Sequence, residues 1–413
     1  MFSKKAFFLL VVLYRIFLDW IYIYQIFPIF AYERFTYTFS TEAFILSWIF
    51  LLFFSLFVSF FLKVKSPVVS YAAVMFFFLR LVPLTSYLST DSFPASFYLL
   101  NFIFWFLFYV LLLNLKRIKV PLHFKSEHAI YWITLLMLLV VVYVSGRYTG
   151  FRMNFNLANV YELRMEARNF SMPLWLTYLW PATQNTLPIL MVFFMIKKKW
   201  GWSILIAFII FLNFSVNGSK STLFKMFLCF GLQLLAKPEK LLKYLILGFM
   251  ALCVFSIIES ILLDTSVISS MVIRRMLYVP NLLDYLYFDF IDQNGPVFYN
   301  SEEASAIAFD VGNEYFDKSE MRCNNGLFTD AYSNLGWLGI FVYPFVLAMF
   351  FKVCESAFKG VNPQIVLFAT FLIVTTFGST TITTSLLTHG LFLLCLVLYC
   401  MPSLSNRCSK YTI

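Results

Sequence analysis

The chain has 413 residues, of which 61% are hydrophobic and only 13% are charged. Because a soluble domain carries roughly a quarter charged residues, this composition excludes an ordinary soluble protein and predicts that lipid covers most of the exterior. The net charge of +10 does not call for nucleic acid, since a membrane protein becomes basic when its cytoplasmic loops carry Lys and Arg. We therefore expect membrane lipid, and no nucleic acid, as a partner.

Continuous apolar runs recur along the chain without the period-2 alternation of strands. About twenty apolar residues cross the hydrocarbon core as a helix, and only helices or closed barrels satisfy the backbone there. The sequence predicts an all-α polytopic membrane helix bundle with about twelve transmembrane helices, built as a single domain over residues 1–413. The expected spans are 7–27, 43–62, 67–83, 97–115, 129–145, 174–196, 201–217, 222–236, 244–263, 334–351, 363–378 and 386–402.

The cations are divided unequally between the two sides that this topology defines. The segments that share the side of the N-terminus hold eighteen Lys and Arg residues, and the opposite side holds ten. The positive-inside rule then predicts a bacterial inner-membrane protein with both termini in the cytoplasm. Two long loops, 146–173 and 264–333, become periplasmic, and long external loops on a tight bundle are where we expect a site.

The kind of cation also differs between the two sides. Sixteen of the eighteen inner cations are Lys, whereas eight of the ten outer cations are Arg. Lys is sufficient for topology, but Arg presents a planar fork that contacts phosphate or carboxylate at two points. The bias indicates an anionic ligand at the outer face, although any single loop Arg could instead pair with a neighbouring acid.

The first candidate site is the run 161–168 in the first long loop. As a helix, this run places Arg164 and Arg168 one turn apart on one face. The pair would suit a lipid diphosphate at the membrane surface, and Arg147, just beyond the fifth span, could join it. The alternative is a solvated helix with internal ion pairs.

The second candidate is the run 217–221, which joins two unusually short spans in a tight turn. Such a shallow hairpin would hold Lys220 near the hydrocarbon boundary and direct Lys225 towards the bundle. An ionisable residue so placed indicates a functional site. The alternative is that the two lysines merely extend to the interface.

The third candidate opens the second long loop with Arg274 and Arg275, followed by aromatic residues that include Tyr278. Aromatic rings stack on sugars while guanidinium forks hold phosphate, so this run suits a sugar–phosphate ligand. The alternative is a structural helix that lies on the bilayer with aromatic anchors.

Further polar residues lie within or beside expected spans. Asp330 and Asn334 are four apart at the entrance of a span, where Asp330 could equally be a helix cap. His389 is the one histidine of three that the topology places near the outer face, although a lone His there is more often a satisfied polar group. Arg15 and Asp19, four apart in the first span, predict a structural ion pair.

The topology and several short patches together resemble the O-antigen polymerases, the Wzy family of oligosaccharide repeat-unit polymerases. The Arg-x10-Gly pattern of some members is absent, since Trp175 and Leu286 stand eleven residues after Arg164 and Arg275. The patches are Tyr161–Arg164, Gly218–Lys220, Arg274–Arg275 with Pro280, Gly326–Gly339 and Thr388–Gly390.

The resemblance implies a periplasmic glycosyl transfer that polymerises undecaprenyl-diphosphate-linked oligosaccharide repeat units into O-antigen or a related surface polysaccharide. A chain-length regulator protein would be a further partner. On this hypothesis Arg164, Arg274 and His389 are catalytic. The expected substrate-binding residues are Arg147, Arg168, Lys220, Arg275, Tyr278, Asp330 and Asn334.

The outer loops contain no paired-carboxylate motif such as DxD, and no CxxC or Cys/His spacing indicates a metal site. Fixed Arg and Lys side chains would then stabilise the departing diphosphate, so we expect a metal-independent glycosyltransferase with no cofactor. An O-antigen ligase is a rival with the same chemistry and a different acceptor. A flippase or transporter of lipid-linked oligosaccharide and a membrane-bound acyltransferase are rivals of other classes; a transporter would typically show an internal repeat.

Overall fold

The computed structural model describes residues 4–121, 124–154, 160–234 and 240–403, and the regular elements in these ranges are all helices. The chain folds as two compact units. Unit 1 comprises Met1–Ile118, Leu242–Val353 and Val374–Ile382, and unit 2 comprises Lys119–Leu241, Cys354–Ile373 and Thr383–Ile413. The all-α fold class expected from the sequence is confirmed.

Nine helices among the described residues are long and apolar enough to cross a membrane. Two shorter apolar helices, Pro363–Phe377 and Leu391–Cys400, match two further expected spans, and Lys220–Leu234 matches the expected span 222–236, whose last two residues lie outside the described part. A polytopic helical membrane protein is therefore confirmed, while the number twelve stays a prediction. The nine are Lys4–Glu33, Thr41–Phe61, Pro67–Leu88, Ala95–Asn114, Glu127–Thr149, Leu174–Ile196, Trp200–Asn217, Leu241–Leu263 and Trp337–Ala357.

Unit 1 is built from three separate stretches of sequence, of which the last and shortest is Val374–Ile382. The N-terminal stretch forms α1 (Lys4–Ile21), η1 (Tyr22–Ile26), α2 (Phe27–Phe30), η2 (Ala31–Glu33), α3 (Thr41–Phe61), α4 (Pro67–Phe76), η3 (Phe77–Leu81), α5 (Val82–Leu88) and α6 (Ala95–Asn114). The second stretch forms α12 (Leu241–Leu263), η5 (Ser269–Tyr278), α13 (Val279–Asn294), α14 (Ser301–Phe316), α15 (Leu327–Leu335) and α16 (Trp337–Ala357).

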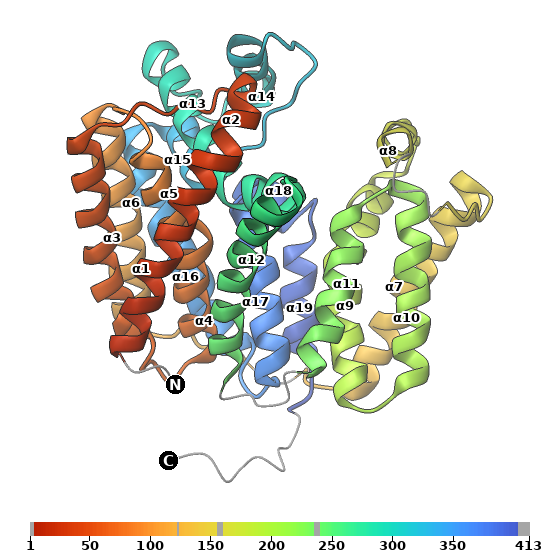
Figure 1. Ribbon diagram of the computed structural model, residues 1–413. Coiled ribbons are helices and arrows are strands. Elements are labelled where there is room, and N and C mark those ends of the chain that lie inside the picture. Colours follow the sequence, from red (N-terminus) through yellow and green to blue (C-terminus); the bar gives the residue numbers. More distant parts are fainter. Residues whose placement is uncertain (1–3, 122–123, 155–159, 235–239, 404–413) are drawn as a thin grey trace. The chain divides into compact units, whose positions relative to one another are not determined.

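The connection 264–333, expected as a long loop, is largely helical. It contains η5, α13, α14 and most of α15. Within unit 1, α13 and α14 lie beyond the ends of the long helices, at the end opposite to the start of α1 (Figure 1). The acidic and aromatic residues of this segment therefore belong to helices and not to an irregular loop.

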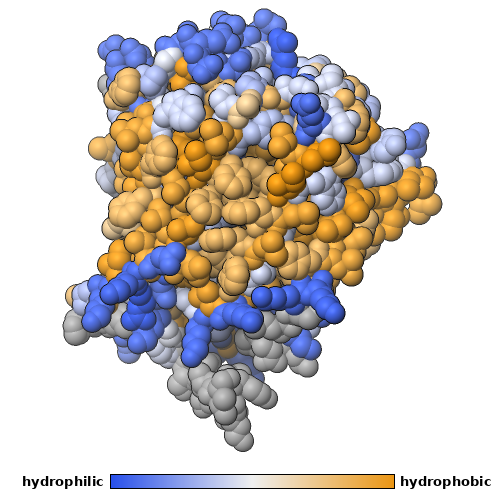
Figure 2. Space-filling model, turned by 90° about the vertical axis from the view of Figure 1, so that its left-hand side faces the viewer, coloured by the Kyte–Doolittle hydropathy of each residue, from blue (hydrophilic) through white to orange (hydrophobic). Residues whose placement is uncertain are grey.

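The helix formed by α4, η3 and α5 is the buried centre of unit 1. Its Phe76 packs edge-on against Phe108 and Phe351, with ring centroids 5.3 and 5.9 Å away. By contrast, α3 turns apolar side chains outwards, and Ile49 and Leu56 are 59% and 58% exposed. Figure 2 shows a hydrophobic band between two hydrophilic edges on the face it presents. Exposed aliphatic side chains in such a band are stable in lipid rather than in water.

Unit 2 contains α7 (Glu127–Thr149), α8 (Val160–Arg168), α9 (Leu174–Ile196), α10 (Trp200–Asn217), α11 (Lys220–Leu234) and α19 (Leu391–Cys400), with most of α17 (Pro363–Phe377) and α18 (Ile382–Leu386). Its central helix is α9, which packs against α7, α10, α11 and α19. Residues 155–159, part of the expected loop 146–173, lie outside the described residues. A core cluster joins α7, α9 and α10 through Val140, Val144, Leu176, Trp180 and Val216.

Local sequence signals explain where several of these helices begin and end. The hydroxyls of Ser40 and Ser126 accept hydrogen bonds from the third amide of α3 and α7, at 3.4 Å in both cases, which is the usual role of an N-cap serine. Gly150, with φ of 57°, ends α7 in the left-handed conformation that glycine tolerates.

Within unit 2, contacts between loops support the predicted alternation of the helices. Lys197, after α9, pairs with Glu127 at the start of α7 at 2.9 Å. Lys125, before α7, donates to the backbone carbonyl of Lys359, before α17. Segments assigned to one side of the membrane from their lysines thus meet. Which side of the membrane they face stays a prediction.

Candidate functional site

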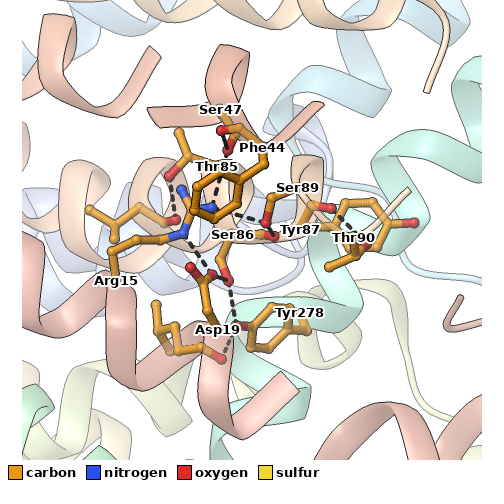
Figure 3. Close-up of polar contacts among 12 residues, drawn as sticks. Arg15, Asp19, Phe44, Ser47, Thr85, Ser86, Tyr87, Ser89, Thr90 and Tyr278 are labelled. Atoms are coloured by element: carbon orange, nitrogen blue, oxygen red, sulfur yellow. Dashed lines mark hydrogen bonds and ion pairs between the residues drawn. The ribbon is translucent and has the colours of Figure 1, made fainter. Parts of the chain in front are cut away.

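The ion pair predicted in the first span is present. Arg15 is completely buried in α1, and its Nε donates to Asp19 Oδ1 at 2.7 Å. Its Nη2 donates to Ser47 of α3 and to Ser89, the residue after α5, at 3.2 and 2.9 Å, as Figure 3 shows. A buried charge needs such partners, and here they tie three helices together, so we interpret the pair as structural.

Tyr278 belongs to the same network rather than to an accessible surface. It is completely buried, and its hydroxyl donates to the carbonyl of Leu18 at 2.8 Å and lies 2.9 Å from Ser86 Oγ (Figure 3). This position is at odds with the expected role of Tyr278 in substrate binding. We assign it instead to the anchoring of η5 on α1 and α5.

Beyond Tyr278, η5 and α13 border a cavity of about 580 Å³ in unit 1. The cavity is open to solvent at the end of the unit that carries α13 and α14, and one carboxylate, that of Glu33, lines it. Four cationic side chains outnumber this carboxylate, so the cavity carries an excess of positive charge. They are Arg274, Arg275, Lys318 and Arg322.

Arg274 forms a fixed wall of this cavity. It is 7% exposed, pairs with Glu33 of η2, and its guanidinium carbon lies 3.8 Å from the centroid of the Phe30 ring. Ion pairing and cation–π contact hold the group in place and neutralise its charge locally. A ligand would meet an arginine whose orientation is set before binding.

The other three cations differ from Arg274. Arg275, Lys318 and Arg322 are exposed, and none of them forms an ion pair with a carboxylate among the described residues. Their charges remain available to a ligand. Exposed cations that converge on one cavity raise the local potential and attract anions.

The uncharged part of the lining includes the ring of Tyr32 and the Phe316 ring at the end of α14. Tyr32 is 74% exposed, so its face is accessible for stacking. Burial raises the pKa of the Cys323 thiol to about 11, so this group is neutral near pH 7.

Arg80, Arg274 and Arg275 share an unusual backbone. Arg80 lies on η3, and the other two lie on η5, and both segments are π-helical. Such turns are rare and occur frequently at functional sites, although the π-helical η1 (Tyr22–Ile26) carries no candidate residue. Because a π-helical turn is wider than an α-helical one, the side chains that follow it point in a different direction. A periodicity of 3.6 residues, taken from the sequence, does not predict this change.

Asp330 and Asn334 are buried in α15. Asp330 accepts a hydrogen bond from the backbone amide of Ile382 at 2.9 Å and another from Asn334 Nδ2 at 2.8 Å. Burial raises the pKa of this carboxyl to about 6. Asp330 therefore caps a helix, as the alternative interpretation expects, but the helix is α18, which begins at Ile382, and not α15. Neither Asp330 nor Asn334 lines the cationic cavity.

In unit 2, the structure brings the first two candidate patches together. Gly218, with φ of 61°, forms the turn between α10 and α11, and a Cβ added there would lie 2.7 Å from the carbonyl oxygen of Val160. Helix α8, which carries Arg164, therefore rests directly on the turn that precedes Lys220.

Around α8 and the turn at Gly218, the four cations that the sequence analysis proposed for a site are all exposed on the surface of unit 2. Nearby, Glu166 of α8 forms an exposed ion pair with Arg152 at 2.7 Å, as the solvated-helix alternative expects. The four are Arg147, Arg164, Arg168 and Lys220.

Lys225 faces the interior of unit 2, which is the direction predicted from the short hairpin. Its Nζ donates to Asn185 Oδ1 at 2.7 Å, and Asn185 Nδ2 donates to the backbone carbonyl of His389 at 2.8 Å. This chain of contacts fixes the loop before α19. The imidazole of His389 is half-buried beside it, and its catalytic role stays a prediction.

Sequence reasoning overlooked parts of the cationic cavity. No pattern in the sequence distinguishes Lys318 from an ordinary surface lysine, yet it lines the cavity with Arg322. The partner of Arg80 is Asp284, at 2.5 Å, and no spacing in the sequence connects residues so far apart. The available signal was the charge of Arg80 inside an apolar span, which by itself indicates a functional or paired residue.

These features define a polytopic helical membrane protein with a cationic, partly aromatic cavity at one end of unit 1. The chain has no significant match among protein-family models, curated proteins or solved structures.

Proposed function

We propose that the protein is a glycosyltransferase that polymerises lipid-diphosphate-linked oligosaccharide repeat units at the periplasmic face of a bacterial inner membrane. The observation that carries the proposal is the cavity of about 580 Å³, whose four cations face a single carboxylate. A diphosphate is the anionic group of such a lipid-linked sugar. Arginine forks match its oxygens in two-point contacts.

The chemistry requires a leaving group and an acceptor. A hydroxyl of the acceptor sugar attacks the anomeric carbon of the donor chain, the bond from that carbon to the diphosphate oxygen breaks, and the hydroxyl proton passes to water. Negative charge grows on the departing lipid diphosphate. Arg275, Lys318 and Arg322 would stabilise this charge electrostatically, and Arg274, which Glu33 holds in place, would do so without reorganisation.

The remaining residues of the cavity support recognition of the sugar. Tyr32 and Phe316 offer aromatic faces, and Arg274 is held rigid by Glu33. Arg164 and His389, which the sequence also proposes as catalytic residues, belong to unit 2.

The proposal is tested first by deletion of the gene and electrophoresis of the lipopolysaccharide. A polymerase predicts a lipid A core that carries a single repeat unit. Complete loss of repeat units would instead indicate an O-antigen ligase or a flippase, and an unchanged ladder of long chains would contradict the proposal.

A residue-level test uses Arg275→Lys in the complemented deletion strain. Lysine keeps the charge but loses the fork, and one charge-assisted hydrogen bond is worth roughly 1.5–3 kcal/mol, so activity should fall by about tenfold or more. Arg34→Lys is the matched control, because Arg34 stands at the same end of unit 1 and donates to the carbonyl of Tyr315 without lining the cavity. Equal chain lengths from the two variants, at equal protein levels, would remove Arg275 from the site.

A further inference from the structure

Unit 1 contains a second, smaller cavity of about 110 Å³. Arg275 lines both cavities. The other polar groups at the smaller cavity are Arg80 of η3 and the hydroxyl residues Thr375 and Ser379, and the rest of the lining is mainly apolar. Apolar surroundings lower the local dielectric constant, so a charge interaction made by these polar groups is stronger than it would be in water.

Arg80 has a hydrogen-bond donor that a ligand could satisfy. It is 5% exposed, and its Nη2 donates to Asp284 Oδ2 at 2.5 Å. The Nη1 nitrogen of the same guanidinium is buried and has no hydrogen-bond partner among the described residues. A buried donor without an acceptor is costly, so the guanidinium has one edge held by protein and the other unsatisfied.

The backbone around Arg80 leaves room for this arrangement. A Cβ on Gly378 would lie 3.3 Å from Arg80 Cδ, and a Cβ on Gly326 would lie 2.9 Å from the carbonyl oxygen of Gly378. Larger residues at either position would press on the stem of Arg80 or on the segment beside it. The two glycines thus permit close packing around the arginine while the cavity stays open.

We propose that the small cavity is a second oxyanion subsite, which binds one phosphate of a diphosphate while the other phosphate occupies the cationic cavity. Arg275, common to both, contacts the two phosphates, and Arg80 Nη1 donates to the inner one. The Ser379 hydroxyl, which donates to the backbone carbonyls of Thr375 and Thr376 at 3.3 and 3.4 Å in the structure, turns to donate to the same phosphate. This inference deepens the proposed function, on which it rests, because it makes the site selective for a diphosphate over a monophosphate.

Binding to the purified full-length protein in detergent tests the subsite without any need for turnover. Farnesyl diphosphate, farnesyl monophosphate and inorganic pyrophosphate serve as probes in isothermal titration calorimetry. The wild-type protein should bind farnesyl diphosphate at least tenfold more tightly than the monophosphate. Pyrophosphate that binds as tightly as farnesyl diphosphate would support a site that recognises the headgroup alone, and weaker pyrophosphate binding would support recognition of the lipid as well.

Two variants separate the subsite from the rest of the cavity. Ser379→Val removes the hydroxyl and narrows the small cavity, and Arg80→Lys keeps the charge beside Asp284 but removes the second nitrogen. Both should lose about tenfold in diphosphate affinity while monophosphate affinity changes less than about twofold. Thr380→Val, one residue further and outside the lining, is the matched control and should bind as the wild type does. Wild-type selectivity in both Ser379→Val and Arg80→Lys would overturn the subsite.

The subsite and the proposed function fail in different ways. Diphosphate selectivity that depends on Ser379, together with an unchanged lipopolysaccharide ladder in the deletion strain, would overturn the polymerase and support the subsite. A lost ladder, with diphosphate affinity indifferent to Ser379→Val and Arg80→Lys, would support the polymerase and overturn the subsite.

Discussion

Replacement of Asp19 by Asn should destabilise the protein strongly, because it leaves the charge of Arg15 without its counter-ion in a completely buried position. Removal of one partner from a buried pair costs about 3–5 kcal/mol. We expect the lower end, about 3 kcal/mol, since an Asn oxygen can still accept from Arg15 and Ser86. The free energy of unfolding, measured by SDS titration in mixed micelles, checks this value.

Two comparisons make the result specific. Arg152 and Glu166 form an ion pair of the same length, 2.7 Å, but their side chains are 40% and 41% exposed, so Glu166→Gln should cost less than about 1 kcal/mol.

The second comparison is Arg15→Met combined with Asp19→Leu, which should recover most of the stability, because an apolar replacement of a whole buried pair is often neutral. The hydroxyls of Ser47 and Ser89 keep their bonds to backbone carbonyls at 2.7 and 2.8 Å. Equal losses from Asp19→Asn and Glu166→Gln would refute the role of burial in this reasoning.

Three further predictions concern the membrane topology, the need for a metal and the pH dependence of stability. Fusions at Ser305 should be active with alkaline phosphatase and inactive with β-galactosidase, and fusions at Lys198 should behave oppositely; the reverse pattern would invert the predicted orientation. Polymerisation by the purified protein should persist in EDTA, and activity that is lost in chelator and restored by magnesium or manganese would refute leaving-group stabilisation by Arg and Lys. Burial raises the pKa of Asp330 to about 6, above its value of about 3.9 in the unfolded chain, so the folded state retains the proton more tightly and stability should fall as the pH rises from about 4 to about 6. Asp330→Asn should remove this part of the pH dependence in unfolding titrations, and an unchanged slope would refute the assignment.

The sequence predicted those features that depend on local pattern. Apolar runs of bilayer length gave the helical class and the positions of most spans, because nothing else satisfies the backbone in lipid. The spacing of Arg15 and Asp19 gave their ion pair, since residues four apart on a helix are neighbours. The run 217–221 gave the tight turn, because Gly218 adopts the left-handed conformation there.

Features that depend on packing between distant segments could not be read in the same way. Tyr278 has the chemistry of a sugar-binding ring, yet the packing of η5 against α1 buries it completely. Lys318 looks like an ordinary surface lysine, yet the end of α14 brings it to the cationic cavity. The outer Arg bias predicts an anionic ligand from residue types alone, but only the fold shows that Arg275 and Arg322 line one cavity while Arg164 belongs to unit 2.

The central claim is a glycosyl transfer that releases a lipid diphosphate, and it is tested most directly with purified protein and one synthetic lipid-diphosphate-linked repeat unit. Mass spectrometry of the products should show lipid-linked dimers and longer oligomers, with one free lipid diphosphate released for each linkage formed. Arg275→Lys should slow both by about tenfold or more, and Arg34→Lys should not. A substrate that stays monomeric with the wild-type protein, or oligomers that form equally fast with Arg275→Lys, would contradict the account.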